Sequence, residues 1–419
     1  MRAPATFESL KIRNYRIFFA GQVLNWTGTW VSWVAQGWLV LRLTDSGFSL
    51  GLITALQWSP ILLFGAWAGV VADRFEKRKI LLFTNGSAAI LSLILGIATV
   101  AGWVTLPLVI VVAVLLGLVT ALDNPTRQAF TMEMVGRERI TNAVSLNTAT
   151  FTIARVVGPV IAALLIKTVG IGECFLVNTV SFIPISVALL RMDRSQLMPV
   201  PAVERGPRQV REGMRYVGSL PVLKVLLIMM AVIGTFQYNF QVILPLLAKH
   251  TFHGDAGTFG LLGATLGAGM FIGSMTNATF GRPGRRIILV AGFSLALFTF
   301  AVAAAPTLLL AALMMIPLGA SSMAFLATMN SSLQLTSSDA MRGRVMALYF
   351  VLFLGSTPIG APILGWVAEA ISPRAAFAFG ATATLVACAY GYFKLPAIKT
   401  EPRGSTVPDE LEEALQEAR

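Results

Sequence analysis

Residues 80–101, ILLFTNGSAAILSLILGIATVA, and residues 106–122, LPLVIVVAVLLGLVTAL, are two apolar stretches that follow one another almost without interruption. A helix needs about 20 mostly apolar residues to cross the hydrocarbon core of a bilayer, so each stretch is predicted to be a membrane span. The rest of the chain has the same character, because 56% of its 419 residues are hydrophobic and only 12% are charged. A soluble domain carries about 25% charged residues, so an ordinary soluble enzyme is excluded.

Similar apolar stretches recur along the whole chain, and they predict an all-α polytopic membrane protein with about twelve transmembrane helices. The expected spans are 17–41, 48–72, 80–102, 106–122, 143–167, 175–190, 222–248, 257–280, 287–305, 307–329, 345–368 and 375–393. They leave room for loops and two tails but for no large extramembrane domain. The two cysteines, Cys174 and Cys388, lie far apart in or beside apolar segments, so a disulfide framework is not expected.

The basic residues are distributed unevenly between the two sides of these spans. Of 32 lysines and arginines, only Arg42, Lys167, Lys249 and Arg374 fall on one side, and Arg155 falls within a span. The positive-inside rule makes the basic side cytoplasmic, so both termini are predicted to be cytoplasmic. The net charge of +12 is thereby explained by the basic loops that orient the protein in the membrane, and no nucleic-acid partner is expected.

Three landmarks recur at an offset of about 204 residues: Gly69 and Gly273, Arg139 and Arg342, and Pro159 and Pro362. The offset predicts two pseudo-symmetric six-helix halves, 17–190 and 222–396, although chance similarity of Gly and Pro positions is the alternative. The Pro-, Gly- and Arg-rich segment 191–221 is expected to be a cytoplasmic linker with at most a short amphipathic helix. A cytoplasmic N-terminus, 1–16, and an acidic cytoplasmic tail, 397–419, complete the organisation.

Four segments resemble a known family. The loop 69–79, GVVADRFEKRK, resembles the signature that the major facilitator superfamily carries between its second and third spans. Segments 13–22, RNYRIFFAGQ, 123–128, DNPTRQ, and 154–159, ARVVGP, resemble the branch that contains the enterobactin exporter and macrolide and multidrug efflux proteins. The resemblance covers essentially the whole chain. It implies an alternating-access secondary transporter that is driven by the proton gradient and needs no cofactor.

In this superfamily the loop after span two is understood to latch the cytoplasmic side closed in one state, which suits a bistable contact. The resemblance therefore assigns a conformational switch to Gly69, Asp73, Arg74, Lys77 and Arg78, together with Asp123 and Arg127 where the chain leaves span four. For the basic residues alone, the alternative is that they only follow the positive-inside rule.

Arg155 is expected roughly 18 Å deep in span five, twelve residues from the predicted start of that helix. A charge at such depth costs about 2.5 to 3.5 kcal/mol on insertion scales, so Arg155 should face a cavity or a partner. Two interpretations stay open. Arg155 is a cationic point in the translocation cavity, or it forms an ion pair with a carboxylate such as Asp123 or Glu133.

Polar and aromatic side chains lie on one helical face of span one, and such a stripe is unfavourable against lipid. It is predicted to line a substrate cavity that holds amphipathic molecules by apolar contact and a few hydrogen bonds. The predicted substrate-binding residues are Gln22, Asn25, Trp26, Thr29, Trp33 and Gln36 in span one, Asn147, Phe151 and Arg155 in span five, and Gln237, Tyr238 and Gln241 in span seven. The alternative is interhelical hydrogen bonding with interfacial tryptophan anchors, which is the interpretation given to Trp38 and Trp30.

Glycines and prolines in two spans are predicted to bend helices or to let them pack closely. They are Gly158 and Pro159 in span five, where superfamily antiporters carry a Gly-Pro signature, and Pro358, Gly360 and Pro362 in span eleven. For the individual glycines, simple packing is the favoured interpretation.

Several absences limit the function. No lysine follows a glycine, so the chain has no Walker loop for ATP. The two histidines, His250 and His253, lie in one outward loop, so neither a metal site nor an enzyme is expected. Span one has no acidic residue, and Asp123 is the nearest candidate for carrying a proton.

These observations predict a monomeric exporter of small amphipathic organic compounds that works by proton antiport and alternating access. One alternative is a dedicated exporter of a siderophore or another natural product, which would be favoured if Arg155 meets an acidic ligand. An alternative from another class is a non-transporting membrane receptor or scaffold.

Overall fold

The structure, a computed structural model, describes residues 5–198, 209–280 and 284–396. These residues form helices joined by short turns, and no strand occurs among them. The prediction of an all-helical fold is therefore confirmed for this part of the chain. The predicted tail at 397–419 and the middle of the predicted linker lie outside the described residues.

The first group of helices comprises α1 to α5. Their bounds are Arg13–Thr44 for α1, Gly47–Arg74 for α2, Lys77–Val100 for α3, Leu106–Thr168 for α4 and Ile171–Leu190 for α5, with short 3-10 helices at Ala5–Lys11 and Arg194–Gln196. Side-chain capping fixes some of these starts. Ser46, for example, accepts a hydrogen bond from the backbone N–H of Ser49 at the beginning of α2.

The second group comprises α6 to α14. It begins with α6, Gln209–Ser219, a short amphipathic helix within the segment predicted as a linker. The others are α7 Pro221–Phe236, α8 Phe240–Leu246, a π-helical turn η3 at Leu247–Thr251, α9 Ala256–Phe280, α10 Arg285–Ala304, α11 Leu308–Thr336, α12 Asp339–Leu354, α13 Thr357–Ala370 and α14 Pro373–Lys394.

Helix α4 differs from the prediction that span four ends at Leu122. It continues to Gly136, where a positive φ of 71° breaks the helix, and then returns as a second arm to Thr168. Asp123 therefore lies within the first arm, about 25 Å from Leu106 and about 20 Å from Gly136 at 1.5 Å per residue. Hydropathy alone ended the span too early, because the polar side chains that follow Leu122 are paired with one another inside the protein.

Ten helical stretches in the described part of the chain are long and apolar enough to cross a membrane. The two arms of α4 count as one of them, and α1 is not included. The tryptophans, amides and hydroxyls of α1 lower its mean hydropathy, although its 32 residues exceed the length that a bilayer requires.

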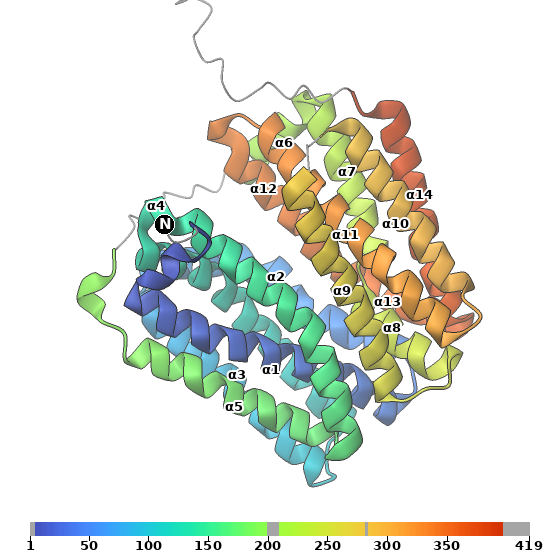
Figure 1. Cartoon of the computed structure of the whole chain (residues 1–419), viewed down its shortest axis with the longest axis horizontal. Helices are drawn as coiled ribbons and strands as arrows, with labels where there is room; N and C mark the ends of the chain where they lie inside the picture. Colours follow the sequence, from blue (N-terminus) through green and yellow to red (C-terminus); the bar gives the residue numbers. More distant parts are fainter. Residues whose placement is uncertain (1–4, 199–208, 281–283, 397–419) are drawn as a thin grey trace, which may run out of the picture.

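Because successive spans run in opposite directions, the turns fall at two ends of the molecule. The end that holds the α2–α3 turn, Gly136 and residues 191–198 is called the basic end. The other end, with the turns at 45–46, 169–170, 252–255 and 371–372, is called the opposite end. Figure 1 shows that the two helix groups meet at the opposite end and diverge toward the basic end.

Close helix packing joins the two groups, chiefly between α2 and α13 and between α4 and α9. A Cβ atom on Gly51 of α2 would collide with the backbone carbonyl of Ala361 in α13, and one on Gly260 of α9 would lie 2.8 Å from the Pro159 carbonyl oxygen of α4. The absence of side chains at these glycines lets the helices approach. Pro159 and Ala361 thus lie at the two contacts between the groups.

Candidate functional site

The polar face of α1 lies inside the protein. Gln22, Asn25 and Gln36 are buried, with 2%, 5% and 7% of their surface exposed, whereas Trp26, Thr29 and Trp33 are half-buried. Gln22 Oε1 and Asn25 Nδ2 have no hydrogen-bond partner among the described residues. Buried polar atoms are usually satisfied, so unpartnered ones along one helix face indicate a place where water or a ligand binds.

An aromatic cluster surrounds this face and joins three helices. The ring centroids of Trp26 and Phe151 lie 4.9 Å apart, those of Trp30 and Trp33 lie 4.8 Å apart, and those of Trp33 and Trp58 lie 6.2 Å apart. These rings come from α1, α2 and the second arm of α4. Trp30 is 8% exposed and packs inside this cluster, so the interpretation of Trp30 as an interfacial anchor is wrong.

Arg155 lies over the face of Trp30, with its guanidinium carbon 5.3 Å from the ring centroid. It is about 28 Å from the Gly136 break and about 20 Å from Thr168, which is deep within the arm. A Cβ on Gly267 of α9, in the second helix group, would lie 3.1 Å from the Arg155 backbone carbonyl oxygen. Arg155 therefore borders both groups in the middle of the molecule.

The suggested ion pair of Arg155 with Asp123 or Glu133 is not present. Asp123 is paired with Arg127, Nε to Oδ2, at 2.8 Å, and Glu133 is paired with Lys77 at 2.8 Å. Both carboxylates are thus engaged by other bases. The stacked position on Trp30 leaves guanidinium N–H groups for a ligand, since a cation over an aromatic face makes no hydrogen bond to it.

The predicted residues of the second group lie at a break between two helices. Helix α7 ends at Phe236 and α8 begins at Phe240, and Tyr238 donates a hydrogen bond to the Ser322 carbonyl at 3.0 Å. Gln237 is 2% exposed and is hydrogen-bonded to Thr299 and Thr384 within the second group. Its amide therefore serves the packing of that group, whereas Gln241 borders the space between the groups.

Two residues of α2 belong to this region and were missed in the sequence. Gln57 Oε1 accepts a hydrogen bond from Gln36 Nε2 at 3.0 Å, and Trp58 contacts Trp33. A small cavity of about 30 Å³ is lined by Trp33, Gln36, Gly37, Leu50, Ile53, Thr54, Gln57 and Gln241. The available signal was the pair Gln57-Trp58 in an otherwise apolar part of span two.

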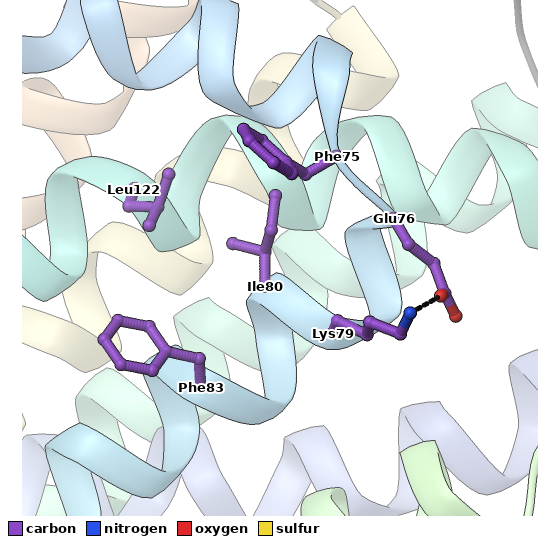
Figure 2. A pocket seen from close by; sticks show the side chains of 6 residues that line it. All are labelled: Phe75, Glu76, Lys79, Ile80, Phe83 and Leu122. Carbon is purple, nitrogen blue, oxygen red and sulfur yellow. Dashed lines mark ion pairs between the residues drawn. The ribbon is translucent and has the colours of Figure 1, made fainter.

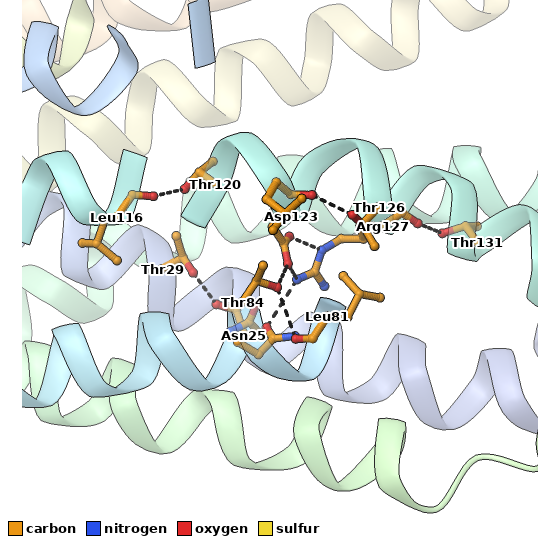
Figure 3. A network of polar contacts seen from close by, with 12 residues as sticks. Asn25, Thr29, Leu81, Thr84, Leu116, Thr120, Asp123, Thr126, Arg127 and Thr131 are labelled. Atoms are coloured by element: carbon orange, nitrogen blue, oxygen red, sulfur yellow. Dashed lines mark hydrogen bonds and ion pairs between the residues drawn. The ribbon is translucent and has the colours of Figure 1, made fainter. Parts of the chain in front are cut away.

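A polar network lies within the first helix group, between α3 and α4 (Figure 3). Arg127 donates to both oxygens of Asp123, at 2.8 and 3.1 Å, and Thr84 donates to Asp123 Oδ1 at 2.7 Å. Asn85 Oδ1 lies 3.4 Å from Arg127 Nη2, while buried Arg127 Nη1 has no partner in the part of the chain that the structure describes. The side chains of Arg127 and Asp123 are only 11% and 16% exposed, so this is a mostly buried ion pair. It joins two helices of the same group.

The residues predicted as a switch sit at the basic end. Arg78 donates to the carbonyls of Leu189 and Leu190 at the end of α5, and Lys77 pairs with Glu133 of α4. Gly69 is buried and Arg74 is exposed. Asp73 is half-buried and has an interaction of its own. Lys77 and Arg78 thus hold α3 to helices of its own group.

A separate cavity of about 300 Å³ lies beside the α2–α3 turn (Figure 2). It is lined by Phe75, Glu76, Lys79, Ile80, Phe83 and Leu122. The two phenylalanines are more than 60% exposed, so the cavity opens on the outer surface of the helix group. A hydrogen bond from Lys79 holds the pKa of Glu76 below its usual value. None of the predicted substrate-binding residues lines it.

The predicted packing residues lie at close helix contacts. A Cβ on Gly158 would collide with Trp30, and one on Gly360 would collide with the Thr235 carbonyl. Pro159 is buried inside α4, and Pro362 lies within α13. Pro358 instead lies in the first turn of α13, where its missing N–H removes no hydrogen bond, so it starts this helix rather than bending it.

Solved transporter structures share this fold. A bacterial homolog of the human lysosomal transporter Spinster, inward-facing and unoccupied, has a TM-score of 0.67 and 15% identity and covers 94% of this chain and 96% of its own. The nucleoside transporter NupG gives 0.72 and 12% (91% and 98% covered), and a D-xylose–proton symporter gives 0.69 and 14% (94% and 99% covered). The fold is therefore that of a membrane transporter.

The chain belongs to the major facilitator superfamily, in the family described as transmembrane secretion effector, which matches residues 4–419. Its members are transporters and not enzymes. The enterobactin exporter EntS of Shigella flexneri is 25% identical over 366 residues, 86% of each chain, and macrolide efflux protein A of Streptococcus pyogenes is 24% identical over 292 residues, 68% of this chain and 70% of the other. The staphyloferrin A transporter of Staphylococcus aureus is 25% identical over 258 residues, 59% of this chain and 62% of the other, less than two thirds of its length.

Proposed function

We propose that this protein is a secondary active exporter of amphipathic organic compounds that works by alternating access between two six-helix halves. The observation that carries the proposal is the aromatic and amide-lined site around Arg155, which lies between the two helix groups. In transporters built from repeated halves, substrates bind near the bilayer midplane at the interface of the halves. Apolar walls with a few convergent polar groups are typical of sites for small organic molecules.

We place the basic end in the cytoplasm of a bacterial inner membrane, with both termini on that side, by the positive-inside rule. We count twelve spans in this proposal. The two arms of α4 are two spans, α7 with α8 and η3 is one, α12 with α13 is one, and α1 is included. Divergence of the helix groups toward the basic end then corresponds to a state that receives substrate from the cytoplasm. We expect the protein to act as a monomer.

A dedicated exporter of a siderophore or similar natural product is the second candidate, and one observation favours it. Arg155 is stacked on Trp30 and forms no ion pair with Asp123 or Glu133. The indole N–H of Trp30 is buried and has no partner among the described residues. These donors together suit an anionic, oxygen-rich ligand. The names of two relatives, which are transporters of enterobactin and staphyloferrin A, support this candidate, and the macrolide efflux relative supports the broader one.

We propose protons as the coupling ion and Asp123 as the acid that carries them. Asp123 lies within the first arm of α4. An ionisable group inside a membrane-spanning helix is costly, which makes this residue a candidate for a functional role. Its pairing with Arg127 and Thr84 gives protonation a structural consequence, because a neutral carboxyl loses the attraction of the guanidinium.

Transport into inverted membrane vesicles tests the proposal. Wild type, Arg155→Ala and Arg155→Lys are compared for uptake of a lipophilic cationic dye and of an anionic siderophore-like compound, with and without an uncoupler. We expect uncoupler-sensitive uptake of at least one compound. For the anionic compound, Arg155→Ala should reduce uptake at least about tenfold, equivalent to about 1.4 kcal/mol of binding. Arg155→Lys should be intermediate, because lysine keeps the charge and loses the planar stack.

Arg137→Ala is the matched control, since Arg137 is an exposed arginine on the same helix. Dye uptake that survives Arg155→Ala would support broad drug export and limit Arg155 to structure. If neither compound is taken up at normal expression, the proposal of energised export fails for these classes, and ligand binding without transport would favour a receptor.

A further inference from the structure

The turn between α1 and α2 is held by charged groups of the other helix group. Asp45 follows the last residue of α1, and its Oδ1 lies 2.6 Å from Lys249 Nζ and 3.4 Å from His250 Nε2. Lys249 also donates to the Leu41 carbonyl at the end of α1, at 3.0 Å. One lysine therefore binds both the carboxylate and a backbone carbonyl at this helix end, where cations are favoured by the helix dipole.

A second contact holds the same turn from another helix. Glu369 near the end of α13 accepts a hydrogen bond from the Ser46 hydroxyl at 2.6 Å and one from the Phe48 backbone N–H at 2.9 Å. The free N–H groups at a helix start attract a carboxylate, so Glu369 caps α2 across the boundary between the groups. We call Asp45, Ser46, Lys249, His250 and Glu369 the opposite-end clamp.

The clamp is built to be reversible. The side chains of Asp45 and Lys249 are 65% and 32% exposed, and exposed ion pairs contribute little to stability. Water can replace each of these contacts when the groups separate. Below the clamp, Gly47 and Gly51 of α2 pack against Gly365 and Ala361 of α13, so the clamp closes the end of a tight seam.

From this geometry we propose that the opposite-end clamp locks the outer end of the transporter shut while the basic end is open, and that the lock must break in every transport cycle. The proposal rests on the alternating-access function proposed above. Alternating access requires two discrete arrangements of the same interface, and contacts that exist in only one of them set the balance between the states. The switch loop at 69–79 and the clamp lie at opposite ends, so each is placed to stabilise a different state.

A distance between the two groups tests the clamp without any substrate. The two native cysteines, both buried, are replaced by alanine, and spin labels are attached at Thr168→Cys and Ile371→Cys, two exposed positions at the opposite end of the first and second group. Asp45→Asn should raise the ratio of molecules with the long distance to those with the short distance roughly threefold. This is the change expected when one exposed ion pair is lost from the closed arrangement. The exchange Asp45→Lys with Lys249→Asp should return the ratio toward wild type.

Asp255→Asn is the matched control. Asp255 is an exposed carboxylate at the same end that accepts a hydrogen bond only within its own group, from the Thr258 N–H at 3.1 Å. Two results would overturn the clamp. One is an unchanged distance ratio in Asp45→Asn. The other is a charge-exchange variant that has the melting temperature of wild type but still shows the raised distance ratio of Asp45→Asn. A changed ratio in a protein that exports neither test compound would keep the clamp and refute the proposed function.

The clamp should also respond to acid. The hydrogen bond and charge of Lys249 hold the pKa of Asp45 below its usual value of 3.8, while partial burial opposes this. His250 adds attraction when protonated, and Glu369 is the neighbouring carboxylate. Since the clamped pKa is lower than the free one, the contribution of Asp45 is complete above the free value and is lost as the pH falls through the clamped value. The distance ratio should therefore not rise between neutral pH and about pH 4, where any charge gained by His250 favours the clamp, and it should rise below about pH 4; in Asp45→Asn this rise should be smaller.

Discussion

Replacing Arg127 with methionine is expected to lower the free energy of unfolding by about 3 kcal/mol, because Asp123 would keep a buried charge without its partner. The two side chains are 11% and 16% exposed and share two hydrogen bonds. Thr84 alone cannot replace a guanidinium, since a hydroxyl brings no charge. Equilibrium unfolding of the purified protein in mixed detergent micelles measures the change.

The double variant Asp123→Asn with Arg127→Met separates loss of charge from loss of packing. Removing both charges from an interior is often nearly neutral, so the double variant should recover most of the lost stability. Lys79→Met is the matched control, because Lys79 pairs with Glu76 at 2.9 Å but is 73% exposed. It should change stability by less than about 1 kcal/mol. Equal losses for Arg127→Met and Lys79→Met would contradict a buried network.

The same network has a functional consequence. If Asp123 carries the coupled proton, the double variant Asp123→Asn with Arg127→Met, which leaves no unpaired buried charge, should keep the fold and abolish the effect of an uncoupler on export, while facilitated movement of the compound down its gradient persists. Loss of the charge on Asp123 would remove its attraction to Arg127, so in this proposal carrying a proton and separating the two side chains are coupled. Among the described residues Arg127 Nη1 has no partner and the contact to Asn85 is long at 3.4 Å, so Asp123 supplies the main contacts of this guanidinium.

Helical periodicity was sufficient to predict the polar face of α1. One helical face carries the polar and aromatic side chains Gln22, Asn25, Trp26, Thr29 and Trp33. In an apolar chain these amides and indoles find hydrogen-bond partners only toward the protein interior. The same rise per residue placed Arg155 inside a helix, but the arm begins at the Gly136 break, so Arg155 lies about 28 Å from that end instead of the predicted depth of roughly 18 Å. Local rules of this kind need no knowledge of neighbouring helices.

Predictions that depended on neighbours succeeded less often. Gln237 shares a periodic pattern with Tyr238 and Gln241, yet its amide is engaged by Thr299 and Thr384 inside the second group. The end of span four was misjudged because hydropathy counts charges and cannot see that Asp123 and Arg127 neutralise each other.

The contacts between residues far apart in the chain could not be predicted from the sequence. Ser46 and Glu369 are 323 residues apart, and neither has an unusual sequence context. Nothing in the pattern of either segment indicates the other. Packing of α2 against α13 brings them together, and that packing depends on glycines whose significance appears only when the opposing backbone is known.

Replacing Gly51 with valine is expected to reduce export at least about tenfold while each helix group stays folded. Gly51 faces the second group, where an added Cβ would collide with the Ala361 carbonyl and lie 2.9 Å from Pro362 Cα. Backbone atoms cannot move aside as a flexible side chain can, so α2 and α13 must separate. A transporter that cannot close its opposite end leaves its cavity open on the wrong side when the basic end opens, and alternating access fails.

Gly65→Val is the matched control, because Gly65 lies on the same helix and no atom outside its own stretch of helix lies within 4 Å of an added Cβ. Vesicle uptake gives the transport rate, and the spin-label pair at Thr168 and Ile371 gives the opening of the opposite end. We expect Gly51→Val to lose uptake and to lengthen the distance, and Gly65→Val to change neither. Wild-type uptake in Gly51→Val would mean that the seam can open during the cycle without cost. Loss of uptake with an unchanged distance would place the defect elsewhere in α2. The two measurements together therefore separate closure of the seam from general damage to the helix.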